Sequence, residues 1–148
     1  MKFEFPSKEW VQAYKKALNN SEKYRIAAGS WQHGAISMVV QSDPESGLMN
    51  PFCVWLDVAG GQCHDARQVT LEEAYGAPFC LIATYKRWID VLSRRLDPIA
   101  GMVTRRIELR GNLLTMMRYV RSAKVMVQCG ASIPSLFLDS ISSKKEES

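Results

Sequence analysis

The chain of 148 residues has few of the side chains that bind metals or carry out acid–base chemistry. It contains two histidines, His33 and His64, and a mononuclear metal site needs further ligands beside them. Cys63 and Asp65 flank His64, but successive side chains on a strand point to opposite faces, so these three cannot converge on one ion. The sequence therefore predicts neither a metal site nor a cofactor.

No two cysteines have the Cys-x-x-Cys spacing of a metal or redox motif. The four cysteines are Cys53, Cys63, Cys80 and Cys129. The amino terminus has no apolar signal segment and carries Glu4 and Glu9, so we expect a cytoplasmic protein with reduced thiols. We interpret the cysteines as small buried apolar residues. No apolar run approaches the roughly 20 residues that a membrane-spanning helix requires.

No motif for catalysis is recognisable in the sequence. His33 has no nucleophile placed near it by any known spacing. Gly60 and Gly61 are not followed by the Gly-Lys of a phosphate-binding loop, and a hairpin turn explains them. We expect a protein without catalysis of its own. An active site built from Cys63 or Cys80 with either histidine remains an alternative.

The net charge of +4 is unevenly distributed along the chain. Residues 85–125 contain ten Lys and Arg against three acids, whereas residues 42–75 contain six acids and Arg67. We interpret the basic half as the solvated faces of amphipathic elements, and we keep contact with anionic lipid headgroups or a phosphate-bearing ligand as the alternative. We expect no nucleic-acid partner, because the basic residues are not interleaved with exposed aromatics and no binding motif is present.

Capping residues and hydrophobic periodicity predict the secondary structure. Ser7 precedes apolar residues at helical spacing, Thr70 and Glu73 have the spacing of a capping box, and Thr84 precedes another helix. The expected helices and helical turns are 7–19, 22–28, 70–74, 85–95, 99–103 and 113–129. The expected strands are 35–41, 52–59, 63–69 (an edge strand), 79–83 and 105–110. Short connections between strands predict a mostly antiparallel sheet with helices over one face, an α+β fold.

The last predicted helix, 113–129, has more apolar side chains than one packing face uses. One stripe consists of Leu113, Met116, Val120, Ala123 and Val127. Three further apolar residues lie off that stripe, beside Arg118 and Arg121: Leu114, Met117 and Val125. Three interpretations stay open: a thicker core, a dimer contact, or the wall of an apolar cavity in which flexible methionines adapt to a hydrocarbon.

Several short motifs in this half of the chain resemble the sterol carrier protein 2 family. The similarity rests on Thr84-x-x-x-Trp88, on Leu96-Asp97-Pro98, and on Ile107-x-Leu109-x-Gly111-Asn112, and it extends over about residues 31–130. The resemblance implies a five-stranded sheet covered by helices, which together enclose a tunnel for sterols, fatty acyl chains or other lipids. It implies a carrier or binding module without catalysis.

The sequence departs from the family pattern in two places. Asn112 stands where aspartate is frequent, and the chain ends in Glu146-Glu147-Ser148 instead of a peroxisomal Ser-Lys-Leu signal. The resemblance therefore implies a cytoplasmic relative and not a peroxisomal one. We expect an N-terminal helical extension at 1–30 (a lid or a dimerisation arm), a lipid-binding domain at 31–138 whose last residues, 136–138, dock on the body, and a disordered tail at 139–148.

The combined reading predicts an apolar ligand, a sterol, fatty acid or acyl lipid, held between the sheet and the helices. The predicted lining residues are Met38, Val40, Val54, Leu56, Trp88, Leu92, Met102, Ile107, Leu109, Leu114, Met117 and Val120. Two alternatives remain: a small enzyme acting on an acyl or coenzyme-linked substrate in the same pocket, and an interaction module that pairs two protomers. Transient contact with an anionic membrane surface and a homodimer are kept as further hypotheses.

Overall fold

The structure, a computed structural model, describes residues 2–138. The helices are α1 (Lys8–Asn19), α2 (Glu22–Ala27), η1 (Pro44–Ser46, a 3-10 turn), α3 (Leu71–Tyr75), α4 (Tyr85–Leu92), α5 (Pro98–Val103), α6 (Leu113–Arg118) and α7 (Val120–Ala131). The strands are β1 (Phe3–Phe5), β2 (Ile36–Gln41), β3 (Phe52–Ala59), β4 (Gln62–Val69), β5 (Phe79–Thr84), β6 (Glu108–Arg110) and β7 (Ser135–Phe137).

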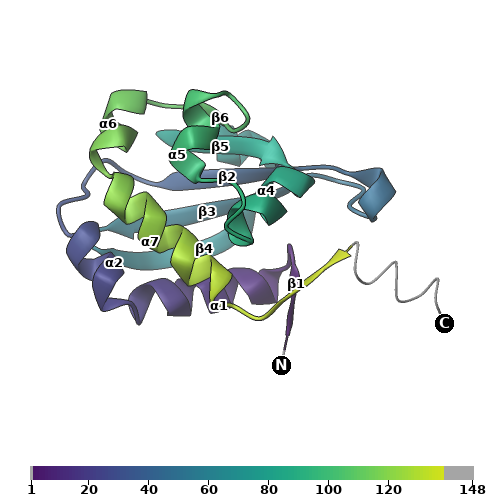
Figure 1. The fold of residues 1–148 in the computed structure, drawn as a ribbon, viewed down its shortest axis with the longest axis horizontal. Coiled ribbons are helices and arrows are strands. Elements are labelled where there is room, and N and C mark those ends of the chain that lie inside the picture. Colours follow the sequence, from purple (N-terminus) through teal and green to yellow (C-terminus); the bar gives the residue numbers. More distant parts are fainter. Residues whose placement is uncertain (1, 139–148) are drawn as a thin grey trace.

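The main sheet has five strands in the order β4-β3-β2-β5-β6 (Figure 1). Strands β2 and β5 run parallel, and every other neighbouring pair in this sheet is antiparallel. The prediction of a five-stranded, mostly antiparallel α+β fold is therefore confirmed, and β4 lies at an edge as expected. The parallel pair arises because α3 and its flanking turns carry the chain from the edge strand β4 back across the sheet to β5.

The capping residues recognised in the sequence begin the helices where they were expected. Ser7 Oγ accepts a hydrogen bond from the Trp10 amide at 3.0 Å, and Thr84 Oγ1 accepts one from the Arg87 amide at 3.2 Å. Thr70 and Glu73 form both halves of the predicted capping box. These local contacts satisfy amides that have no partner inside the helix, and they need no tertiary structure to form.

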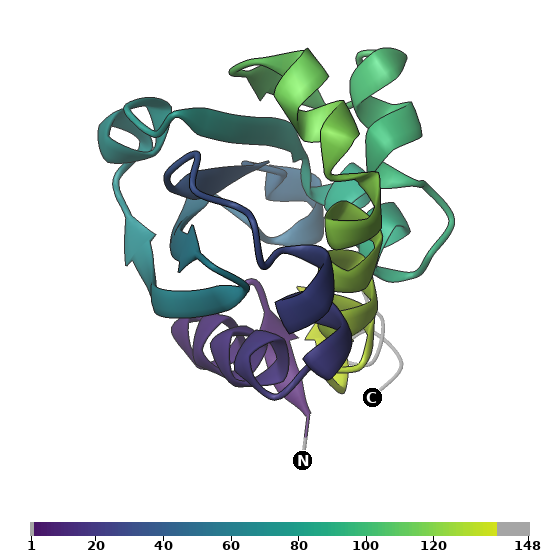
Figure 2. The same cartoon turned by 90° about the vertical axis from the view of Figure 1, so that its left-hand side faces the viewer.

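The helices cover both faces of the sheet, and the prediction that they cover one face is wrong. Most of them pack on the face from which Ile36, Val40 and Leu56 contribute to the main hydrophobic core. On the opposite face, α3 covers a smaller apolar cluster (Figure 2, the teal helix away from the yellow-green α7). There Ser37 Oγ donates a hydrogen bond to the Ala74 carbonyl at 2.6 Å. A five-residue helix is too short for its burial to be read from periodicity.

The predicted helix 113–129 is in fact two helices, α6 and α7, and the prediction of one long helix is wrong. The chain breaks at Tyr119, where φ is −112° and ψ is 34°. The Tyr119 ring packs edge-on against Trp31 with 4.8 Å between centroids, and its hydroxyl donates to the Ser30 carbonyl at 3.2 Å. These contacts with a loop about 90 residues earlier hold Tyr119 out of the helix, and no glycine or proline marks the break.

Two further predicted elements are shorter in the structure. Strand β6 contains only Glu108–Arg110 of the expected 105–110, because the Ile107 amide donates to the Gly101 carbonyl and caps α5 instead of entering the sheet. Helix α4 ends at Leu92 instead of residue 95. Ile107 is nonetheless buried, and its side chain lies against Gly101 so closely that a Cβ there would come within 2.8 Å.

The two ends of the described chain form a small sheet of their own. Strand β1 pairs in parallel with β7, which joins residues more than 130 positions apart and was not predicted as a sheet. The expectation that 136–138 dock on the body fits this pairing, while the expected disorder of 139–148 concerns residues outside the described part of the chain. The Tyr85 hydroxyl donates to the Phe5 carbonyl at 3.3 Å and accepts from the Leu138 amide at 2.8 Å, so one buried phenol holds both ends.

All four cysteines are buried, as their interpretation as apolar residues requires. Burial raises the pKa of the Cys53 thiol and of the Cys63 thiol to about 11, and it also raises the pKa of Cys80 and Cys129. Loss of water around the thiolate is the largest cause at each of them. The thiols therefore remain protonated, and unreactive, across the physiological pH range.

Replacing Tyr85 by Phe should lower the free energy of unfolding by about 1–3 kcal/mol, because it removes the hydroxyl that bonds Phe5 and Leu138. Urea denaturation followed by circular dichroism measures the change. Tyr75→Phe, at an exposed position of α3, is the matched control and should change stability by less than about 0.5 kcal/mol. Equal effects of the two substitutions would contradict the role given to Tyr85.

Stability should fall as the pH rises from about 9 to about 11, because thiols ionise in the unfolded chain near 9.0 but stay protonated in the fold. The Cys63→Ala variant should lose stability more slowly over this range, by up to about 1.4 kcal/mol per pH unit. Val58→Ala removes buried volume opposite Cys63 without removing a thiol, and it should keep the wild-type slope. Urea denaturation at several pH values measures the slopes, and identical slopes for all three proteins would refute this account.

Candidate functional site

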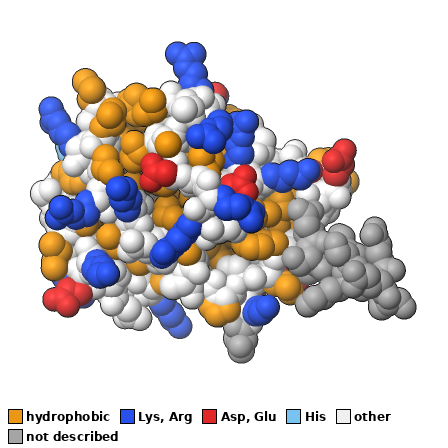
Figure 3. Space-filling model, viewed as in Figure 1, with side chains coloured by type: hydrophobic (Ala, Val, Ile, Leu, Met, Phe, Trp, Pro, Cys, Tyr) orange, Lys and Arg blue, Asp and Glu red, His pale blue; other side chains and the backbone are white. Residues whose placement is uncertain are grey.

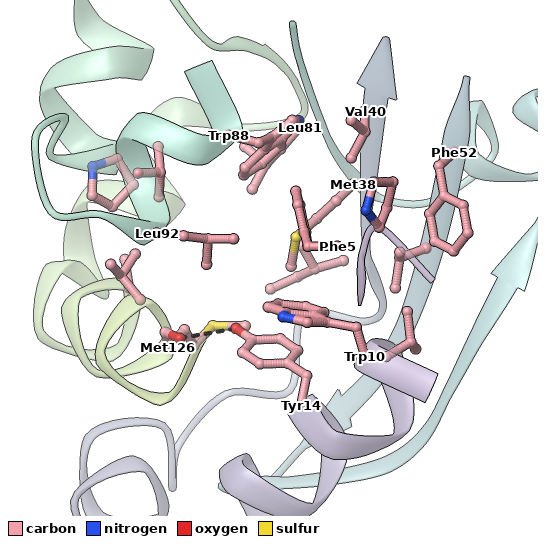
Figure 4. A pocket seen from close by; sticks show the side chains of 18 of the residues that line it. Phe5, Trp10, Tyr14, Met38, Val40, Phe52, Leu81, Trp88, Leu92 and Met126 are labelled. Carbon is pink, nitrogen blue, oxygen red and sulfur yellow. Dashed lines mark hydrogen bonds between the residues drawn. The ribbon is translucent and has the colours of Figure 1, made fainter. Parts of the chain in front are cut away.

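A cavity lies between the main sheet and the helices α1, α4, α5, α6 and α7 (Figure 4). The sheet contributes Ile36, Met38, Val40, Phe52, Val54 and Leu81. The N-terminal segment contributes Phe5, Pro6, Ser7, Trp10, Val11 and Tyr14. The later helices contribute Trp88, Val91, Leu92, Pro98, Met102, Met116, Ala123, Met126 and Val127. The wall is thus apolar and aromatic apart from the side chain of Ser7.

The polar atoms of the large aromatic side chains at the cavity bond to protein groups. Tyr14 donates its hydroxyl to the Met126 carbonyl at 3.0 Å, the bond drawn in Figure 4. Trp88 Nε1 donates to the Val39 carbonyl at 2.9 Å, and Trp10 Nε1 donates to Ser135 Oγ at 2.8 Å. Because these atoms already have partners, the rings present mainly their carbon surface to the space inside.

The cavity is narrow. The centre of a water-sized sphere can move through about 90 Å³ inside it. One water needs roughly 10–15 Å³ by the same measure, so there is room for several water-sized groups. Met38, Met102, Met116 and Met126 form part of the wall, and their unbranched side chains can change rotamer at low cost. A larger guest can therefore widen the space by moving side chains.

A second, smaller hollow adjoins the cavity on the side of α2. It shares the wall residues Ile36, Met116, Ala123 and Met126 with the cavity, and it provides about 20 Å³ by the same measure. Its far side is formed by Tyr24, Trp31, Val58, Tyr119 and Ser122. The shared residues are the partition between the two spaces, and two of them are flexible methionines.

Half of the lining residues predicted from the sequence lie at this cavity. They are Met38, Val40, Val54, Trp88, Leu92 and Met102. These residues come from β2, β3, α4 and α5, where the apolar face of each element was read correctly from its period. The structure brings them together across elements that are far apart in the sequence.

The other half lies elsewhere. Leu56 is fully buried in the core on β3, and Val120 is half-buried at the start of α7. Ile107 and Leu109 line a groove on the outer surface beside α5. Leu114 and Met117 point outward from α6, with 71% and 44% of their surface exposed, so the structure contradicts their prediction as cavity wall. Because the helix breaks at Tyr119, the side chains of α6 do not point in the directions expected for one continuous helix.

The sequence reading missed the contribution of the N-terminal segment to the cavity. Trp10, Val11 and Tyr14 form the apolar stripe of α1, which was recognised as a helix but treated as an extension. These side chains belong to the same hydrophobic cluster as Val54 and Trp88. The stripe itself was the available signal, because an amphipathic helix must bury that face against something.

The cysteines and histidines considered for catalysis lie away from the cavity wall. Cys80 packs in the cluster under α3, on the opposite face of the sheet, and Cys63 packs in the main core without lining the cavity. His64 is exposed on β4, and His33 is exposed on the loop next to Tyr119. Within residues 2–138, no three His, Cys, Asp or Glu side chains come together as potential metal ligands. The alternative of an enzyme draws no support from these residues.

No helix in the described part of the chain, residues 2–138, is long and apolar enough to cross a membrane. Comparison of the sequence with models of known protein families and with curated proteins finds no match. The comparison with solved structures is informative, because it includes matches that agree in both fold and sequence.

Two solved structures are similar to nearly the whole chain. The crystal structure of a sterol carrier protein 2 has a TM-score of 0.80 and 31% identity, and the match covers 88% of this chain and 99% of the other. A solution structure from Thermus thermophilus, described as possibly a sterol carrier protein, has a TM-score of 0.80 and 30% identity over 92% of this chain and 94% of its own. A ubiquinone synthesis protein, UbiJ-SCP2, is 14% identical with a TM-score of 0.52 over 78% and 86% of the two chains, which shows a shared fold alone.

The first two matches combine the same arrangement of sheet and helices with about three identical residues in ten over almost their full lengths. That agreement extends beyond the short motifs at Trp88, Pro98 and Gly111, and matches over 88% and 92% of the chain must include part of the N-terminal segment that lay outside the resemblance. The chain belongs to the sterol carrier protein 2 family.

Proposed function

We propose that this protein binds an apolar ligand, such as a fatty acid or another acyl lipid, in the cavity between the sheet and the helices, without chemical change to the ligand. The observation that carries the proposal is the wall itself, in which apolar and aromatic carbon surrounds the space and the tips of Trp10, Tyr14 and Trp88 are engaged by the protein. Transfer of hydrocarbon from water into such a site is favourable, and the buried part of the ligand needs no polar group.

The size of the cavity favours a flexible chain over a rigid ring system. Burial of hydrocarbon gains about 0.8 kcal/mol per methylene. A micromolar complex corresponds to about −8 kcal/mol, after the cost of association has been met. The space of about 90 Å³ accommodates a short length of acyl chain at once, whereas a sterol requires the helices or the methionines to move apart first. We therefore place acyl chains before sterols.

We propose a cytoplasmic carrier that transfers its ligand, with a functional unit at 31–138 and the segment 1–30 completing the wall through α1. An enzyme acting in the same cavity is less well supported, because the side chains at the wall offer carbon, sulfur and one serine hydroxyl to a substrate. Whether the protein forms a homodimer is tested by analytical ultracentrifugation.

The affinity for saturated fatty acids should rise with chain length by about fourfold per added methylene, which corresponds to about 0.8 kcal/mol each. The rise should stop at the length that fills the cavity, since further methylenes remain in water. Displacement of a fluorescent fatty acid by acids of increasing length, on protein freed of bound lipid, measures this series. Affinity independent of chain length would contradict binding in an apolar cavity.

Filling the cavity should weaken fatty-acid binding without unfolding the protein. Ala123 lies on α7 at the partition between the cavity and the smaller hollow, so Ala123→Phe places a ring in the available space. We expect at least about tenfold weaker fatty-acid binding. Ala131→Phe, on the same helix but outside the cavity wall, is the matched control and should bind like the wild type. Native mass spectrometry and fluorescence displacement report binding, and undiminished binding by Ala123→Phe would rule out this cavity as the site.

A further inference from the structure

The outer face of α5 and α6 carries an exposed apolar patch. It consists of Val103, Leu113, Leu114 and Met117, whose exposed fractions are 56%, 37%, 71% and 44%. We call these four residues the α5–α6 patch. Figure 3 shows apolar side chains gathered over these two helices at the top of the view. Elsewhere the largest exposed apolar side chains, such as Ile26 on α2, stand apart from this group in the chain.

The helices that carry the patch are also a wall of the cavity. Met102 and Met116 line the cavity, while their sequence neighbours Val103 and Met117 belong to the patch. Successive residues on a helix point about 100° apart, so one helix can serve both sides. The patch and the cavity are therefore separated by a single layer of helix.

A groove leads from the patch toward that layer. It runs beside α5 and β6, and its lining includes Leu109, Leu113 and Met102. Leu113 belongs to the patch, and Met102 belongs to the cavity wall as well as to the groove. The Met102 side chain, which is 6% exposed, is thus the partition between the groove and the cavity. A flexible thioether side chain can swing aside more easily than a branched or aromatic one.

The surroundings of the patch are strongly cationic. From Pro98 to Ala131 the sequence has six Lys and Arg and a single acid, Glu108. Glu108 is already paired, since its carboxylate lies 2.9 Å from Arg110 Nε. Arg105, Arg106, Arg118 and Arg121 are exposed, and Figure 3 shows Lys and Arg side chains around the apolar group. An apolar centre with a cationic rim complements the acyl and headgroup layers of an anionic bilayer.

A second copy of the chain fits this surface less well. A symmetric dimer brings the same patch of each protomer together, so the cationic rims would face each other. Facing like charges oppose association, and Glu108, the one acid between residues 98 and 131, is already paired with Arg110. The charge therefore favours an anionic surface over self-association.

We propose that the α5–α6 patch docks on an anionic lipid surface and that an acyl ligand passes between the bilayer and the cavity along the groove beside Met102. The stages of the path share side chains, since Leu113 belongs to both the patch and the groove and Met102 to both the groove and the cavity wall. The groove lining also includes Arg105 and Glu108 beside its apolar residues. The second part rests on the proposed function, since it supposes that the cavity holds an acyl chain. The docking itself does not depend on it.

Docking is tested by sedimentation with vesicles of phosphatidylcholine alone or mixed with phosphatidylglycerol. The wild type should bind the mixed vesicles at least tenfold more tightly, and roughly 1 M salt should weaken that binding by shortening the Debye length to about 3 Å. The double variant Leu114→Glu, Met117→Glu should lose at least tenfold in vesicle affinity, as should Arg118→Glu, Arg121→Glu. The controls Ile26→Glu and Lys23→Glu, on exposed positions of α2, should bind like the wild type.

Passage through the groove is tested by the rate at which a fluorescent fatty acid moves between protein and mixed vesicles. Leu109→Trp narrows the groove at a side chain outside the patch, so it should slow transfer at least fivefold with vesicle binding and fatty-acid affinity in solution unchanged. Ile26→Trp, at an exposed position of α2 outside both the groove and the patch, should transfer at the wild-type rate.

Several results would overturn the proposal. Equal binding to neutral and anionic vesicles, or full binding by the two double variants, removes the docking site. A dimer seen by analytical ultracentrifugation that Leu114→Glu, Met117→Glu dissolves assigns the patch to a second copy instead. Equal transfer rates for Leu109→Trp and Ile26→Trp remove the path. If the wild type binds no fatty acid in solution, the proposed function fails while vesicle binding still decides the docking.

Discussion

Hydrogen bonds from large aromatic side chains set the spacing between the layers around the cavity. Trp88 joins α4 to the Val39 carbonyl on β2, and Tyr14 joins α1 to the Met126 carbonyl on α7. Pulling such a buried donor from its partner costs about 1–3 kcal/mol, so the rings stay at the edge of the space and keep the layers from closing on it. A core of aliphatic residues alone has no such hydrogen bonds between its layers. Its side chains would pack until they reached the packing density of an ordinary protein interior.

The same principle extends to the chain ends. Trp10 reaches Ser135 of β7, and Tyr85 holds both the Phe5 carbonyl and the Leu138 amide. Strands β1 and β7 have only three residues each, which is too few for a two-stranded sheet to persist alone. Their pairing therefore depends on these side chains, and the closure of this side of the cavity depends on contacts between residues over 100 positions apart in the sequence.

The features that could be predicted from the sequence are those that depend on residues close together in the chain. The caps at Ser7, Thr70 and Thr84, the hairpin turn at Gly60 and the five strands depend on contacts within a few residues, and they were found. The break at Tyr119 depends on a loop in the first quarter of the chain, and the β1–β7 pair depends on the two ends meeting. Neither the break nor the pairing of the two ends produces a pattern among neighbouring residues. The hydrophobic periodicity therefore predicted one continuous helix through Tyr119, and it predicted no pairing of the ends.

The apolar excess at 113–129 shows why only half of the candidate site could be read from the sequence. Its composition indicated correctly that more carbon is present than the core uses, but the direction of Leu114 and Met117 depends on the break at Tyr119. Left in water, these side chains gain nothing from the hydrophobic effect, at about 25 cal/mol for each Å² that stays exposed. In the monomer these exposed side chains leave that free energy ungained, and the docking on a lipid surface that we propose would gain it. On the path we propose, an acyl ligand that crosses the α5–α6 layer moves between two largely apolar surroundings.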